Sequence, residues 1–231
     1  MTPLLMIPGM MCDARLFGPQ TTAFSAQRTV IHAPIGAYDT VQALAAEVLR
    51  HAPQRFALAG LSMGGIVAME VVRQAPDRVD RLALLDTNPL AETDAVKARR
   101  APQIADVEAG HLMRVMRDQM IPNYLADGPC RREIETLCET MAMTLGPEVF
   151  VRQSRALRSR PDQQDTLRGF GGHALVLCGQ HDALCPVERH RLMADLLPRS
   201  TLRIIEGAGH LPTLEHPQDT CRHIARWLEA E

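Results

Sequence analysis

The stretch Gly60-Leu61-Ser62-Met63-Gly64-Gly65 decides how this chain of 231 residues folds. The apolar run from Arg55 to Ala59 before it is typical of a buried strand, and the run from Met63 to Ala75 after it has the period of a helix. A direct turn from a strand into a helix strains the central residue, and glycines beside it avoid collisions across the turn. The pattern therefore predicts that Ser62 is presented at the carboxyl end of a sheet, beside helix N–H groups that favour a developing negative charge.

Strand and helix patterns alternate on both sides of this turn. Apolar runs typical of buried strands occupy residues 3–7, 29–33, 55–59, 81–87, 173–179 and 201–207. Amphipathic helical patterns occupy residues 40–51, 63–75, 187–197 and 217–228. This alternation predicts an α/β protein with βαβ units around a mostly parallel sheet flanked by helices.

Residues 90–172 interrupt the alternation. Their charged and amphipathic sequence has helical spacing and no strand pattern, which predicts four or so helices. Helix breaks are expected at Pro102, Gly110, Pro122, Gly128-Pro129, Gly146-Pro147 and Pro161. We therefore expect a core formed by residues 1–89 and 173–231, with an all-helical insertion at 90–172.

The composition is that of an ordinary folded protein, with 46% hydrophobic and 23% charged residues. With 25 basic against 27 acidic residues the net charge is -2, so no overall basic field attracts nucleic acid or an anionic membrane. The chain has no apolar run of about 18 residues and no basic region of the kind that opens a signal peptide. We expect a soluble, cytoplasmic protein that binds neither nucleic acid nor a membrane.

The sulfur-containing residues are numerous. The cysteines have no C-x-x-C pairs, and since cytoplasmic thiols stay reduced we expect all six to be free. They are Cys12, Cys130, Cys138, Cys178, Cys185 and Cys221. Cys12 and Cys185 are alternative nucleophiles, although small buried thiols are the simpler interpretation.

The chain has twelve methionines but only five Phe, two Tyr and one Trp, so thioether side chains fill space that aromatic rings often fill in other proteins.

A nucleophilic serine needs a base and an orienting carboxylate. Asp182 follows the strand expected at 173–179, and His210 follows the strand expected at 201–207. Loops that leave parallel strands meet at the carboxyl edge of the sheet, so we expect both side chains near Ser62.

Other residues are alternatives for these two roles. Asp86 ends the strand expected at 81–87 and is a second candidate for the acid, while His181 and His216 are second candidates for the base. His, Asp and Glu residues nowhere have the spacing of a metal site, and the first strand-turn-helix lacks the dinucleotide-binding glycines. We expect no metal and no cofactor.

These motifs together give the chain a resemblance to serine hydrolases of the α/β-hydrolase fold, of the lid-bearing carboxylesterase type. The resemblance rests on the turn at 60–65, on Gly179-Gln180-His181-Asp182 and on Gly207-Ala208-Gly209-His210 followed by Glu215-His216-Pro217, and it covers essentially the whole chain. It implies that Ser62 attacks an acyl carbonyl, that His210 takes the proton, and that Asp182 orients the imidazole.

The same resemblance implies an oxyanion loop at Ile7-Pro8-Gly9-Met10-Met11. The backbone N–H groups of Met10 and Met63 are then expected to hold the oxyanion. Pro8 stands where the family commonly has His, which removes a side chain that sometimes braces this loop, but the donor is a backbone group.

The resemblance further implies that the insertion is a lid whose inner face forms the substrate pocket. Met113, Met116 and Met120 follow i, i+3 and i+7, which predicts a thioether stripe on one helix. The stripe either packs the lid on the core or lines a flexible apolar pocket for a medium acyl chain or alicyclic ester. We expect these three residues, with Tyr124 and Leu211, to line the pocket.

Several basic residues also fall in the insertion. They are Lys97, Arg99, Arg100, Arg114, Arg117, Arg131, Arg132, Arg152, Arg155, Arg158 and Arg160. Two interpretations are open. In the first, one of these residues binds a carboxylate, a phosphate or an acidic carrier protein. In the second, which is simpler, they form a solvated helical face together with the acids of the insertion.

The expected activity is hydrolysis of a small to medium carboxylic ester or thioester through an acyl-enzyme intermediate, and the expected partner is this small-molecule substrate. A serine nucleophile argues against the related dehalogenases and epoxide hydrolases, which use an acid. Two alternatives stay open: hydrolysis of a carbon-carbon bond in a diketone ring-cleavage product by the same triad, and a small-molecule receptor on the same fold.

Overall fold

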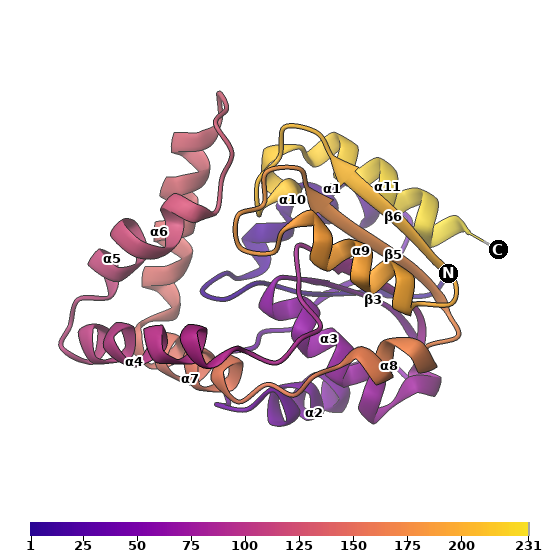
Figure 1. Ribbon diagram of the computed structural model, residues 1–231. Coiled ribbons are helices and arrows are strands. Elements are labelled where there is room, and N and C mark those ends of the chain that lie inside the picture. The colour runs from indigo at the N-terminus through magenta and orange to yellow at the C-terminus, as the bar shows by residue number, and fades with distance from the viewer. Residues whose placement is uncertain (231) are drawn as a thin grey trace.

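The computed structural model describes residues 1–230 and contains one parallel sheet (Figure 1). The strand order is β2-β1-β3-β4-β5-β6. The strands are β1 (Leu4–Ile7), β2 (Val30–His32), β3 (Phe56–Leu61), β4 (Val79–Leu85), β5 (His173–Gly179) and β6 (Ser200–Ile205). All the strands expected from the apolar runs are present, which confirms the α/β class and the parallel sheet.

Helices cover both faces of this sheet (Figure 1). One face carries α2 (Val41–His51), α3 (Met63–Gln74), α8 (Gln164–Gly169) and α9 (Val187–Leu196). The other face carries α1 (Gly18–Phe24) and α11 (Pro217–Glu229), with the short helix α10 (Pro212–Glu215) beside them. The sequence patterns did not predict α1 and α10, because each is too short to repeat a helical period.

Between β4 and β5 the chain is helical, and the part of it before α8 lies to one side of the sheet (Figure 1). It forms α4 (Asp94–Glu108), α5 (Leu112–Val115), a π-helical turn (Met116–Met120), a 3-10 turn (Ile121–Asn123), α6 (Arg131–Leu145), α7 (Pro147–Arg158) and then α8. The predicted break at Gly146-Pro147 is present, since Gly146 has a φ of 84° between α6 and α7.

The break predicted at Pro102 is wrong, because α4 runs through this residue. Proline lacks the N–H group that would bond to the carbonyl of Ala98, four residues earlier. Both residues are exposed, so a water molecule can donate a hydrogen bond to the Ala98 carbonyl in place of the missing N–H group. A proline on the solvent side of a helix is therefore tolerated here.

The hydrophobic core is continuous from the sheet into the insertion. Every residue of β3 is buried, and the same cluster of apolar side chains includes Met116, Met141 and Phe150 of the insertion. All six cysteines are free. None of the helices in residues 1–230 combines the length and apolar character that crossing a membrane demands.

Candidate active site

Ser62 lies at the turn between β3 and α3, in a backbone conformation that non-glycine residues rarely adopt. Its φ is 55° and its ψ is −117°. A Cβ atom on Gly60 would lie 2.3 Å from the Gly64 oxygen, and one on Gly64 would lie 2.0 Å from the Ile7 oxygen. Only glycine fits these contacts, and holding Ser62 at positive φ costs roughly 1–3 kcal/mol that the surrounding packing must supply.

Two contacts with the end of β4 hold the serine backbone. The Ser62 N–H donates to the Leu85 oxygen at 2.9 Å, and the Thr87 hydroxyl donates to the Ser62 oxygen at 2.7 Å. Thr87 is itself held by His190, whose Nε2 accepts the Thr87 N–H at 3.0 Å while Nδ1 lies 3.3 Å from the Pro186 oxygen. Burial lowers the pKa of His190 to about 4, so it is neutral and can accept this hydrogen bond.

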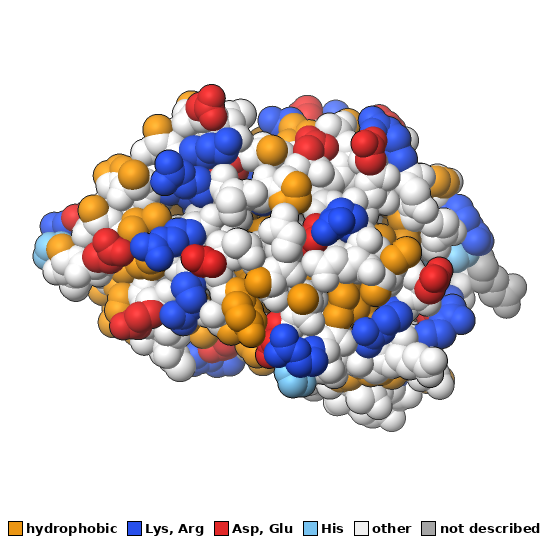
Figure 2. Space-filling view, turned by 90° about the horizontal axis from the view of Figure 1, so that it is seen from below, with side chains coloured by type: hydrophobic (Ala, Val, Ile, Leu, Met, Phe, Trp, Pro, Cys, Tyr) orange, Lys and Arg blue, Asp and Glu red, His pale blue; other side chains and the backbone are white. Residues whose placement is uncertain are grey.

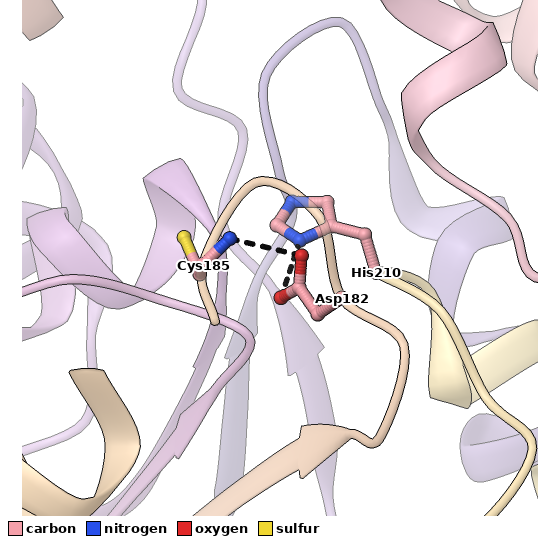
Figure 3. Close-up of side chains that lie close together, drawn as sticks. All are labelled: Asp182, Cys185 and His210. Atoms are coloured by element: carbon pink, nitrogen blue, oxygen red, sulfur yellow. Dashed lines mark hydrogen bonds and ion pairs between the residues drawn. The ribbon is translucent and has the colours of Figure 1, made fainter. Parts of the chain in front are cut away.

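His210 and Asp182 meet in the loops that leave β6 and β5. His210 Nδ1 lies 2.9 Å from Asp182 Oδ2, and the two residues are 3% and 5% exposed (Figure 3). The other Asp182 oxygen accepts the N–H groups of Leu184 at 2.8 Å and Cys185 at 2.9 Å. These bonds leave Oδ2 directed at His210, and a carboxylate oxygen can only accept, which favours the tautomer in which Nδ1 donates and Nε2 is the acceptor.

The charge of Asp182 is stabilised in this position. Burial by itself would raise the pKa of its carboxyl, but nearby His210 and the three hydrogen bonds outweigh burial. The pKa of Asp182 is therefore lowered, and the carboxylate is ionised at neutral pH.

Asp86, the other candidate acid, has a different environment. It is fully buried at a φ of 45°, and its Oδ1 accepts the Gly179 N–H at 2.9 Å. Burial, and then the charge of Asp182, raise the pKa of the Asp86 carboxyl well above its usual value, so the charged form is disfavoured there. The buried Asp86 Oδ2 has no hydrogen-bond partner within residues 1–230. The structure pairs His210 with Asp182 and makes Asp86 a neighbour of that carboxylate.

The loop that carries His210 is tied to the insertion. The His210 N–H donates to the Tyr124 oxygen at 2.7 Å. The Glu215 carboxylate accepts the N–H groups of Gly209 and Leu211, each at 2.9 Å, and of Ala126 at 2.8 Å. Sequence reasoning assigned no role to Glu215, although it follows His210 in the motif quoted above. Its carboxylate joins the His210 loop to residues 124–126.

Ser62 and His210 line one cavity of about 250 Å³. Five of the residues expected at the oxyanion site or in the pocket also line it: Met10, Met63, Met120, Tyr124 and Leu211. Within residues 1–230, the backbone N–H groups of Met10 and Met63 donate to no protein acceptor. The alternative bases His181 and His216 are absent from the described lining of this cavity.

Met113 and Met116 do not line the cavity within the described chain, contrary to the sequence prediction. The π-helical turn at Met116–Met120 has more residues per turn than an α-helix, so the spacing i, i+3, i+7 no longer keeps one face. Met116 is buried in the core and Met113 is half-buried. Of the predicted stripe, Met120 alone lines the cavity.

Cys12 and Cys185 line the same cavity but are poor nucleophiles. Burial raises the pKa of both thiols well above the usual value, so neither forms a thiolate at neutral pH. Cys185 also lies beside the Asp182–His210 pair, and ligand atoms of these three residues lie within 4.8 Å of one another (Figure 3). They are the one group of potential metal ligands in the described residues, yet Asp182 and His210 already satisfy each other and the thiol is neutral.

The chain is similar to proteins of one large family. A model described as "Alpha/beta hydrolase family" matches residues 11–223. A pimeloyl-[acyl-carrier protein] methyl ester esterase of Salmonella newport is 26% identical over 195 residues, which cover 80% of this chain and 74% of that protein. The biotin biosynthesis bifunctional protein BioHC of Teredinibacter turnerae is 25% identical over 211 residues, which cover 84% of this chain and 36% of that longer protein.

Solved structures agree with the fold. A thermophilic esterase from Thermogutta terrifontis, solved with malate bound, has a TM-score of 0.91 and 28% identity, covering 99% of this chain and 90% of that one. An enol-lactonase from Burkholderia xenovorans has a TM-score of 0.86 over 99% of this chain and 91% of that one; at 20% identity it shows the fold alone. The comparisons support ester hydrolysis at the level of the family.

Proposed function

Because the chain belongs to the alpha/beta hydrolase family, we propose that it is a serine hydrolase that cleaves a small to medium carboxylic ester or thioester. One observation carries the proposal: a serine on a strained strand-to-helix turn and a histidine bonded to a buried carboxylate line the same cavity. A nucleophile, a base and an orienting acid are the three groups that acyl transfer by serine requires.

The proposed reaction begins with attack of Ser62 Oγ on the acyl carbonyl, while His210 Nε2 takes the hydroxyl proton. Asp182 holds the Nδ1 proton and stabilises the imidazolium. Collapse of the tetrahedral intermediate expels the alcohol or thiol, which leaves with the proton from His210, and the acyl group stays on Ser62. Water then attacks the acyl-enzyme with His210 again as base, releasing the acid and restoring the serine.

We assign the oxyanion to the N–H groups of Met10 and Met63. Both residues line the cavity beside Ser62, and Met63 opens α3, where the helix dipole favours negative charge. Each such donor is worth about 3 kcal/mol of transition-state stabilisation. The proposed steps require neither a metal nor a cofactor.

We further propose that residues 90–172 act as a lid on a core of residues 1–89 and 173–231. Met120, Tyr124 and Leu157 of this insertion line the cavity with Ser62, which supports the assignment. The free thiols support a reducing compartment such as the cytoplasm.

The test is hydrolysis of p-nitrophenyl esters of increasing chain length, with labelling of Ser62 by a fluorophosphonate. We expect turnover and labelling for the wild type, and loss of both in Ser62→Ala. Ser25→Ala, at an exposed serine that ends α1, is the matched control and should behave as the wild type.

A wild type that turns over no ester or thioester and leaves Ser62 unlabelled would overturn the proposal. Ligand binding without turnover would then favour the receptor alternative. Turnover of a diketone with no turnover of esters would favour hydrolysis of carbon-carbon bonds.

A further inference from the structure

The lining of the cavity includes a group of cationic side chains. Three arginines of the insertion line it, Arg99 and Arg100 from α4 and Arg160 after α7. Glu92 is the one acidic side chain among the lining residues that the structure describes. Three arginines and one glutamate leave a formal charge of +2 in a cavity that also holds Ser62 and His210.

These arginines differ from the other basic residues of the insertion. Several of the others form exposed ion pairs, including Arg114 with Asp106 and Arg155 with Glu108. Acidic and basic side chains are interspersed on the face shown in Figure 2, as on an ordinary solvated surface. The expectation of a solvated helical face thus fits those residues, but it does not fit Arg100 and Arg160, whose side chains are largely buried.

The arginine cluster is built into the protein. The Glu92 side chain is 1% exposed, and those of Arg100 and Arg160 are 13% and 10% exposed. Arg100 Nε lies 3.0 and 2.9 Å from the two Glu92 oxygens, and Arg160 Nη1 lies 2.9 Å from Glu92 Oε1. Arg160 Nε donates to the Leu90 oxygen at 2.9 Å. Glu92 and the Leu90 carbonyl therefore fix both guanidinium planes.

This arrangement leaves positive charge uncompensated away from bulk water. One carboxylate neutralises only one of the two guanidinium groups that share it. Burial lowers the pKa of Arg160, which means that the cation is disfavoured where it lies. Burying an unpaired charge is costly, and an anion from a ligand would remove that cost.

The cluster also has donors to spare. Within residues 1–230, Arg100 Nη1 and Arg160 Nη2 donate to no protein acceptor, and Arg99 makes neither a hydrogen bond nor an ion pair. A guanidinium presents its N–H groups in a planar fork that matches the two oxygens of a carboxylate. We propose that Arg99, Arg100 and Arg160 form a subsite for a free carboxylate on the substrate, so that the preferred substrates are half-esters of dicarboxylic acids.

The subsite shares its cavity with the reacting groups. Arg160 lines this cavity together with Cys185, whose sulfur lies within 4.8 Å of ligand atoms of Asp182 and His210. Arg100 lines it together with Tyr124, whose ring centroid lies 6.0 Å from that of His210. Because the cations and the reacting groups line one cavity of about 250 Å³, we expect the carboxylate to be only a few carbon atoms from the ester. Short half-esters fit such a cavity.

The inference rests on the proposed ester hydrolysis, and the experiment separates the two. Monomethyl glutarate is compared with methyl 5-methylhexanoate, which replaces the carboxylate by an uncharged isopropyl group. For the wild type we expect kcat/KM for the charged ester to exceed that for the neutral ester by about tenfold or more, the usual range for hydrogen bonds to a charged group.

In Arg99→Gln this ratio should fall toward one, and in Arg160→Gln as well. Arg99 is exposed and unpaired, so its substitution leaves folding intact even where loss of Arg160 disturbs Glu92. Arg114→Gln, in an exposed ion pair with Asp106, is the matched control and should keep the wild-type ratio.

Calorimetric titration of glutarate into Ser62→Ala gives a readout that does not need turnover. We expect binding there, and loss of binding when Arg99→Gln is added. A ratio of the two kcat/KM values near one in the wild type would overturn the subsite. So would a ratio, together with glutarate binding, that stays unchanged in Arg99→Gln and Arg160→Gln. Failure to hydrolyse either ester, with Ser62 unlabelled by fluorophosphonate, would instead overturn the proposed function.

Discussion

Replacing Asp182 by asparagine tests the proposed roles most sharply, because the surrounding loop dictates how the new side chain must lie. Asp182 Oδ1 accepts two backbone N–H groups, from Leu184 at 2.8 Å and Cys185 at 2.9 Å. An amide nitrogen cannot accept them, so the asparagine oxygen stays there and its NH2 group faces His210 Nδ1. His210 must then accept at Nδ1 and carry its proton on Nε2. In this tautomer it cannot take the proton of Ser62.

The magnitude follows from the loss of the base. The equivalent substitution in a serine triad costs about 10⁴ in kcat, which corresponds to about 5 kcal/mol of activation free energy. We expect a loss of about 10³ to 10⁴ in kcat for Asp182→Asn, with little change in KM. The assay is hydrolysis of a short p-nitrophenyl ester, with a thermal unfolding scan to show that the variant is folded.

Asp86→Asn is the matched control. The Asp86 Oδ1 that accepts the Gly179 N–H stays an oxygen, and the amide NH2 takes the place of Oδ2, which has no hydrogen-bond partner within residues 1–230. The hydrogen bond of this side chain to Gly179 survives and the Asp182–His210 pair is untouched, so we expect activity within about threefold of the wild type. Activity of Asp182→Asn within tenfold of the wild type would refute the reasoning. So would a larger loss for Asp86→Asn than for Asp182→Asn.

Two further predictions concern stability. Because the pKa of buried His190 is about 4 in the folded protein and about 6.5 when unfolded, stability from its neutral form is complete above pH 6.5 and is lost as the pH falls toward 4. At about 1.4 kcal/mol for each pH unit, this loss in the free energy of unfolding reaches roughly 3 kcal/mol. Urea unfolding should show that the free energy of unfolding of His190→Gln depends less on pH than that of the wild type between pH 4 and 6.5. The same pH dependence in both proteins would contradict this role of His190. In Glu215→Gln an NH2 group, which cannot accept a hydrogen bond, replaces one carboxylate oxygen. The variant loses either the Leu211 bond at Oε1 or the Gly209 and Ala126 bonds at Oε2, so the free energy of unfolding should fall by about 1–3 kcal/mol. An unchanged urea midpoint would show that the Glu215 contacts are not needed.

Much of the fold was readable from the sequence because the signals are local. Apolar runs of strand length, helical periods and the glycines around Ser62 each express the backbone preferences of neighbouring residues. They predicted the strands and the turn at Ser62. The prediction failed at Pro102, where exposure of α4 decides whether a proline is tolerated, and exposure depends on distant packing.

Local patterns were thus enough to predict the order of strands and helices, the strained turn at Ser62 and the loops that carry Asp182 and His210. Asp86 and Asp182 both follow parallel strands, and only the three-dimensional structure decided which carboxylate bonds to His210. It likewise decided that Met116 is buried in the core and that Arg160 lines the cavity. Distances between loops, and the burial that shifts pKa values, arise from contacts between residues far apart in the chain, which local patterns do not encode.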